Sequence, residues 1–155
     1  MPLYFAYGSN LNCDQMQLRC PASTPAGIAR LEGWQFLINT RGSANIIPAE
    51  THEVWGVLWR STPTCMATLD VYEGVANRHY ARRMMRIILA GKPVMAITYV
   101  GRNRSPGRAR RGYLDGRILP AAREWALPPG YLAELDRWMA RGMIPPRGRK
   151  NPLRA

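Results

Sequence analysis

A strand-like run followed by a polar turn stands at the start of the sequence. Residues 3–7 are apolar and stop at Gly8, Ser9 and Asn10, which predicts a buried strand ending in a tight turn. Gly8 allows either a positive φ or the close approach of a ligand. Successive N–H groups of such a turn can bind an anion, although a purely structural turn has the same pattern.

Two carboxylates in residues 69–74 are the other candidates for chemistry. Glu73 stands directly before Gly74, where a helix end leaves room for a ligand, and one carboxylate can serve as both general base and general acid. Asp70 lies three residues earlier, so the two could share a helical face. Such a pair would raise one pKa or bind a metal, but a structural Asp70 is the favoured interpretation. A surface carboxylate at a helix end is the structural alternative for Glu73.

Together these stretches resemble the gamma-glutamylcyclotransferase family, also called the AIG2-like or BtrG-like group. The family opens with Tyr-Phe-Ala-Tyr-Gly-Ser-Asn-Leu and continues with a strand, a Leu-Asp-x-x-Glu-Gly helix end and two later tyrosines. The matching parts here are residues 4–11, 53–59 and 69–74, followed by Tyr80 and Tyr113.

The sequence departs from the family pattern near its C-terminal helix. The segment from Tyr113 to Pro128 is one residue longer than usual. Ala126 stands where the family has Gly, and Pro120 interrupts the expected helix.

The resemblance implies an α+β fold, a small mixed β-barrel with a few flanking helices and a cavity at one end. It also implies a small-molecule gamma-glutamyl substrate whose α-amine attacks its own γ-carbonyl. This reaction releases 5-oxoproline and an amine or amino acid, and it needs neither a metal nor an organic cofactor. Glu73 would be the catalytic acid and base, with a pKa raised by aromatic neighbours such as Tyr72 and Tyr80. The expected substrate-binding residues are Tyr4, Phe5, Ala6, Tyr7, Gly8, Ser9, Asn10 and Tyr113.

The identity of the departing amine stays open, as does one non-enzymatic interpretation. A gamma-glutamylamine or an acylated metabolite could replace a gamma-glutamyl peptide as substrate. A basic module that binds an anion or nucleic acid is the other alternative, because the net charge is +12. Residues 101–155 hold thirteen Lys and Arg and four Asp and Glu. No nucleic-acid motif accompanies this charge, so a solvated basic surface is favoured over nucleic-acid binding.

Composition and cysteine spacing argue against a membrane protein, a disulfide-rich protein and a metalloprotein. A chain of 155 residues fits one domain, and its apolar runs are too short to span a membrane. The odd cysteine count, with Cys13, Cys20 and Cys65, argues against a disulfide framework. His52 and His79 lie at no ligand spacing from other candidates, so we expect no metal site. With no signal-peptide pattern, we expect a cytoplasmic location; the oligomeric state stays open.

The strands and helices that would form this barrel can be placed along the chain. Residues 1–140 would form one domain, followed by a basic, mobile tail over residues 141–155, whose removal should leave turnover unchanged. Turn signals at Gly33 and Pro48 divide the long apolar stretches into shorter strands. Strands are predicted over residues 3–7, 27–31, 33–38, 44–47, 53–60, 80–89 and 93–100, and helices over 12–19, 63–74, 114–126 and 129–140.

Overall fold

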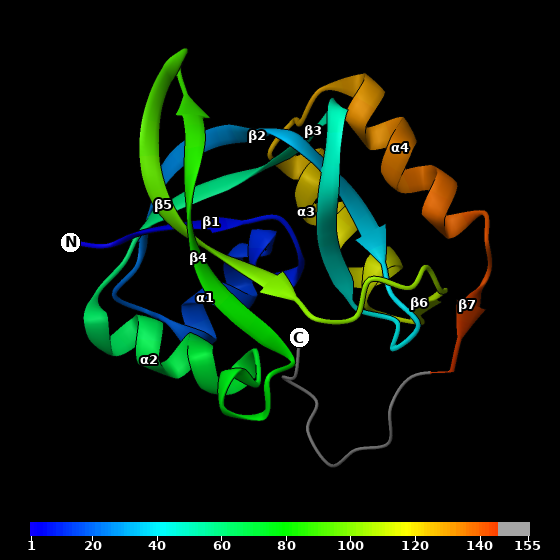
Figure 1. Ribbon diagram of the computed structural model, residues 1–155, viewed down its shortest axis with the longest axis horizontal. Coiled ribbons are helices and arrows are strands. Elements are labelled where there is room, and N and C mark those ends of the chain that lie inside the picture. The colour runs from blue at the N-terminus through cyan, green and yellow to red at the C-terminus, as the bar shows by residue number, and fades with distance from the viewer. Residues whose placement is uncertain (146–155) are drawn as a thin grey trace.

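Five strands of the computed structural model, which describes residues 1–145, close into a barrel. The strand order is β1-β3-β2-β4-β5, and β5 pairs with β1 in parallel to complete the ring, whereas the other neighbours are antiparallel. Helices flank the barrel, with α2 and α4 on different sides (Figure 1). This arrangement confirms the predicted α+β barrel. The barrel strands are β1 (Leu3–Ala6), β2 (Thr24–Ile38), β3 (Ala44–Arg60), β4 (Tyr80–Leu89) and β5 (Lys92–Gly101).

The long hairpin of β2 and β3 corrects the prediction of four shorter strands. Gly33 has a φ of +82° at a register shift between Glu32 and Trp34, so a β-bulge absorbs this glycine within the strand. Pro48 pairs with Trp34 beside the bulge and does not end β3. The sequence pattern predicts a strand end at each of these residues, but the β-bulge in the pairing of β2 with β3 accommodates both inside one hairpin.

The two helices that precede and follow this hairpin lie where they were predicted, although α2 ends at Tyr72, two residues earlier than expected. Asn12 caps α1 (Cys13–Arg19) and Thr62 caps α2 (Pro63–Tyr72), each by accepting a backbone N–H of the first turn. Gly74, with a φ of +64°, follows Glu73 at the end of α2 and starts the 3-10 turn η2 (Val75–Asn77).

The C-terminal helical segment differs from the single predicted helix. A π-helix, η3 (Leu114–Ile118), leads into α3 (Leu119–Glu124), and Pro120 lies in the first turn of α3. A π-turn takes up one extra residue, which matches the longer spacing between Tyr113 and Pro128. The amphipathic helix α4 (Pro129–Met139) follows as predicted and buries Tyr131 and Leu135.

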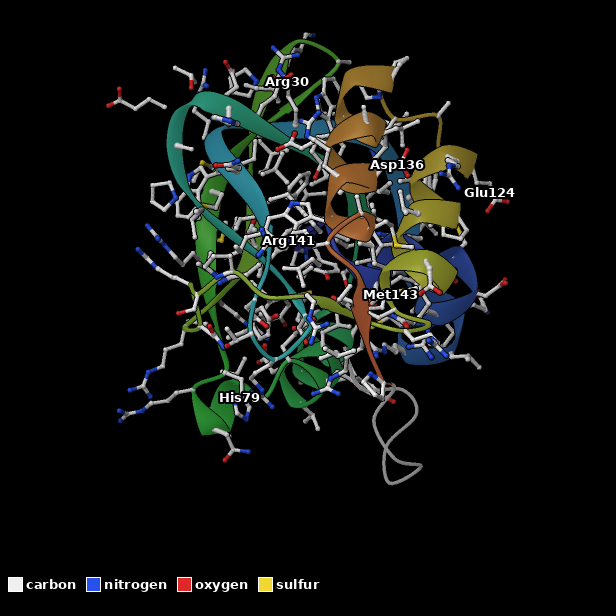
Figure 2. The ribbon with its side chains drawn as sticks, turned by 90° about the vertical axis from the view of Figure 1, so that its right-hand side faces the viewer. Arg30, His79, Glu124, Asp136, Arg141 and Met143 are labelled. Atoms are coloured by element: carbon white, nitrogen blue, oxygen red, sulfur yellow. The ribbon has the colours of Figure 1, made fainter. Side chains whose placement is uncertain are left out.

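The segment after α4 folds back onto the loop that precedes η3. There β7 (Met143–Ile144) pairs in parallel with β6 (Ala109–Arg110), and Figure 2 shows Met143 on this returning strand. The first residues of the predicted mobile tail, 141–145, therefore include a strand that pairs with the rest of the fold. Residues 146–155 of that tail lie outside the described residues.

Candidate active site

A small recess at one end of the barrel gathers most of the residues singled out from the sequence. Its volume is about 20 Å³, enough for one water-sized group. Ala6 does not line it, because that residue is buried in β1 against Gly56 of β3. The lining consists of Tyr4, Phe5, Tyr7, Gly8, Ser9, Asn10, Ala44, Glu73, Tyr80, Tyr99 and Tyr113.

Glu73 reaches the recess from the C-cap of α2. Its backbone N–H donates to Leu69 O (2.8 Å), which fixes the residue before the chain turns at Gly74. Only 9% of Glu73 is exposed. Burial raises the pKa of its carboxyl group from 4.5 to about 7, against the opposing effect of the Arg19 charge; the nearby charge of Asp70 adds to the rise. Near neutral pH this carboxyl group can therefore both accept and donate a proton.

Tyrosine hydroxyl groups form much of the wall around Glu73. Tyr113 Oη accepts the N–H of Ala44 (3.0 Å), and Tyr80 Oη donates to Ala44 O (2.5 Å), so both rings are anchored to the start of β3. Tyr7 Oη donates to Tyr99 O (2.6 Å). Burial raises the pKa of Tyr7, Tyr80 and Tyr113, so their hydroxyl groups stay protonated at neutral pH.

The turn after β1 forms the opposite part of the recess. The first hydrogen bond of the 3-10 turn η1 (Ser9–Leu11) runs from Leu11 N–H to Gly8 O (3.0 Å), so the N–H groups of Gly8, Ser9 and Asn10 are not donors within this turn. Gly8 has a φ of −110°, so this turn does not need glycine for a positive φ. A Cβ there would lie 3.4 Å from Tyr113 Oη.

Side chains of α1 hold this turn in place. Ser9 Oγ accepts from Gln15 Nε2 (2.7 Å), and Asn10 Oδ1 accepts from the same nitrogen (2.8 Å). Asn10 Nδ2 donates to Tyr4 Oη (3.0 Å). Both polar side chains that the sequence suggested as substrate contacts therefore have structural partners, and the backbone of the turn is left to meet a ligand.

Arg19 is the functional candidate that sequence reasoning missed. It is buried at the end of α1, where its Nη1 donates to Asn10 Oδ1 (3.2 Å) and its guanidinium group lies 4.2 Å from the centre of the Tyr72 ring. Its Nε and Nη2 are buried without a hydrogen-bond partner among the described residues. The charge of Arg19 lowers the pKa of Glu73. A single arginine in a short polar helix carries no sequence signal of burial.

Asp70 has a structural role, as the favoured interpretation expected. Its carboxylate accepts two hydrogen bonds from Arg82 (2.7 and 2.8 Å) and one from Tyr99 Oη (2.7 Å). Within residues 1–145, no group of three His, Cys, Asp or Glu side chains is arranged to hold a metal ion.

A larger outer pocket of about 390 Å³ is next to the recess, and Glu73 and Tyr80 line both. His79 lines this pocket at the end of the barrel opposite Arg30 (Figure 2). His79 Nδ1 contacts Arg41 Nη1, and the ring packs against Gly74. The outer pocket is lined by Asn39, Arg41, Ser43, Tyr72, Glu73, Asn77, Arg78, His79, Tyr80, Arg102 and Asn103.

No helix in the described part of the chain has the length and apolar character that crossing a membrane requires.

Comparisons with known proteins agree on one family. The family described as "Gamma-glutamyl cyclotransferase, AIG2-like" matches residues 4–126. The mouse protein named gamma-glutamylcyclotransferase is 31% identical over 144 residues, covering 86% of this chain and 76% of the mouse protein. Its human counterpart is 31% identical over 112 residues, covering 65% of this chain and 60% of the human protein.

Solved structures show the same relationship. A structure titled "Gamma-glutamyl cyclotransferase" superposes with a TM-score of 0.80 at 27% identity and covers 96% of this chain and 90% of its own. Since the family match includes the turn after β1, Glu73 and Tyr113, the chain belongs to the gamma-glutamyl cyclotransferase, AIG2-like family of enzymes.

Proposed function

We propose that this protein cyclises a gamma-glutamyl compound, releasing 5-oxoproline and an amine, with Glu73 as the catalytic acid and base. The observation that carries this proposal is a buried carboxyl group with a pKa of about 7 in the same recess as the turn after β1. An ordinary exposed glutamate would be too weak a base for an ammonium group, and it would already be ionised at neutral pH and so hold no proton to give to a departing amine.

The proposed reaction needs one carboxylate that relays two protons. Glu73 takes a proton from the substrate α-ammonium group, and the resulting amine attacks the γ-carbonyl carbon. A carbon–nitrogen bond forms and closes the five-membered ring. The bond to the departing nitrogen then breaks as protonated Glu73 returns its proton to that nitrogen. The restored carboxylate passes the second proton of the ring nitrogen to the departing amine, which leaves as an ammonium ion, and no external acid is needed.

The turn after β1 supports the charge that develops on the substrate. The N–H groups of Gly8, Ser9 and Asn10 can bind the carbonyl oxygen as it becomes negative, or the substrate carboxylate. Because main-chain groups would do this, Ser9 is not required as a nucleophile. Its Oγ already accepts a hydrogen bond from Gln15 Nε2, and among residues 1–145 no basic or acidic side chain is hydrogen-bonded to it.

Release of 5-oxoproline by the wild-type protein and by Glu73→Gln tests the proposal. We expect the variant to lose about 10²–10⁴-fold in rate, the usual contribution of a general acid–base group. Glu124→Gln, at the exposed end of α3, is the matched control and should keep the wild-type rate. Wild-type turnover by a correctly folded Glu73→Gln would refute the assigned role.

A further inference from the structure

The departing amine, which the sequence leaves open, occupies a strongly basic environment if the substrate reacts at Glu73. The recess is too small for a glutamyl group, so most of the substrate must lie in the outer pocket. That pocket is lined by Arg41, Arg78 and Arg102. Glu73 is the only carboxylate among the described residues that line it, so its walls carry a surplus of positive charge.

The three arginines come from separate parts of the chain, and their backbones converge on His79. Arg41 contacts His79 Nδ1 and stands in the β2–β3 turn, where its N–H donates to Asn39 Oδ1 (3.0 Å). Arg102 follows β5, and its N–H donates to His79 O (3.0 Å). Arg78 ends η2 with a φ of +58°, a conformation rare for an arginine.

None of these arginines forms an ion pair with an acidic side chain within residues 1–145. The ion pairs among residues 1–145 involve Arg30, Arg82 and Arg123, and none includes Arg41, Arg78 or Arg102. Three cations kept close together without an anion repel one another. A bound anion would relieve this repulsion. An anion with a single carboxylate group would leave most of it in place, whereas one with two would offset more of it.

The basic environment extends beyond the outer pocket. Arg78, Tyr80 and Arg102 also line a neighbouring groove of about 620 Å³, whose floor includes Val75 and Val100. Arg83 and Arg104 also border this groove, as does Arg82, whose charge is paired with Asp70. A departing group longer than one amino acid could therefore meet further positive charge.

We infer that the outer pocket selects substrates whose departing amine carries at least two negative charges, such as a dicarboxylic amino acid. This inference rests on the proposed function, since it names the substrate class of the same site. Arg78 and Arg102 are the specificity-determining residues, because they stand where the outer pocket and the groove meet.

Three substrates with the same glutamyl group provide the test: gamma-glutamyl-glutamate, gamma-glutamyl-glutamine and gamma-glutamyl-propylamine. Their departing amines carry two carboxylates, one carboxylate and none, respectively. Glutamate and glutamine have nearly the same shape, so the first two compounds differ mainly in charge. We expect kcat/KM to be about tenfold higher for the glutamate than for the glutamine compound, and lowest for the propylamine compound. This preference should shrink when NaCl rises from about 0.05 to 0.5 M, because salt screens exposed charges.

The double variant Arg78→Gln/Arg102→Gln should reduce the preference for glutamate over glutamine to about twofold, and its kcat/KM should fall much more for the glutamate compound than for the propylamine compound. The matched control is Arg60→Gln/Arg86→Gln, which removes two exposed arginines that line neither cavity. It should retain the wild-type preference, and thermal unfolding of both variants checks their folding.

The outcomes separate the two levels of the argument. Absence of 5-oxoproline from all three compounds would contradict the proposed function itself. Release at equal kcat/KM from the glutamate and glutamine compounds would overturn the inference and leave the function standing. An equal loss for all three compounds in the arginine variant would also overturn it, because the arginines would then bind the glutamyl carboxylate that the substrates share.

Discussion

At the scale of single residues, the site is built around a carboxyl group whose charge the fold makes costly. Burial among tyrosines raises the pKa of Glu73 to about 7, while Arg19 limits the rise. An unfolded chain would hold the same group near 4.5. The folded protein therefore binds a proton at Glu73 more tightly than the unfolded chain does, so proton binding there favours folding.

This difference predicts how stability depends on pH. The stabilisation is complete below about pH 4.5 and is lost as pH rises through about 7, where folded Glu73 ionises. Its size is about 3 kcal/mol, since each pKa unit corresponds to about 1.4 kcal/mol. Glu73→Gln has no such titrating group. Its free energy of unfolding should therefore rise relative to that of the wild type by about that amount between pH 4.5 and pH 8.

Urea unfolding of both proteins at several pH values measures the effect. Glu124→Gln serves again as control, because its carboxylate is exposed. A gap between wild type and Glu73→Gln that stays constant across this range would mean that Glu73 does not titrate near 7.

At the scale of elements, the end of α3 carries a strain that the sequence hinted at. Ala126 has a φ of +57°, the left-handed conformation in which the family usually has glycine. An L-residue with a Cβ pays about 1–2 kcal/mol there. Ala126→Gly should therefore stabilise the protein, although the greater freedom of unfolded glycine reduces the gain to about 1 kcal/mol.

Thermal unfolding can detect this gain as a rise of about 2–4 °C in Tm. Ala121→Gly, in the interior of α3 with ordinary helical geometry, should lower Tm, because glycine is a poor helix former. If both substitutions lowered Tm, the conformation of Ala126 would not be a source of strain.

Local signals at the ends of elements explain what the sequence could predict. Asn12, Thr62 and Gly74 act within their own turns, so their positions alone indicate where α1 and α2 begin or end. Gly33 and Pro48 were misread because a bulge depends on the partner strand, which lies too far away in sequence to be recognised from local pattern.

The candidate site divides in the same way. The turn after β1 and Glu73 belong to compact motifs and were predicted together. Arg19 and the arginines of the outer pocket are scattered along the chain, and only tertiary contacts at Asn10, Tyr72 and His79 give them a place.

At the scale of the whole molecule, the C-terminal segment connects distant parts of the chain. Arg111 N–H donates to Ile144 O (2.9 Å), and Arg110 Nε donates to Arg41 O (2.9 Å). The side chain of Ile144 also lies next to Gly42. β7 thus supports β6, which in turn holds the β2–β3 turn that carries Arg41 into the outer pocket.

Two truncations separate this support from the residues that follow it. A chain ending at Pro145 keeps every contact described above, so its kcat/KM and Tm should match those of the full-length protein. A chain ending at Gly142 loses β7 and the hydrogen bond to Arg111, so Tm should fall by about 2–4 °C for each kcal/mol lost. Its KM for gamma-glutamyl-glutamate should rise with little change in kcat, because the loosened turn presents Arg41 less well while Glu73 is unaffected. Equal KM values for the two truncated proteins would show that β7 does not position the turn.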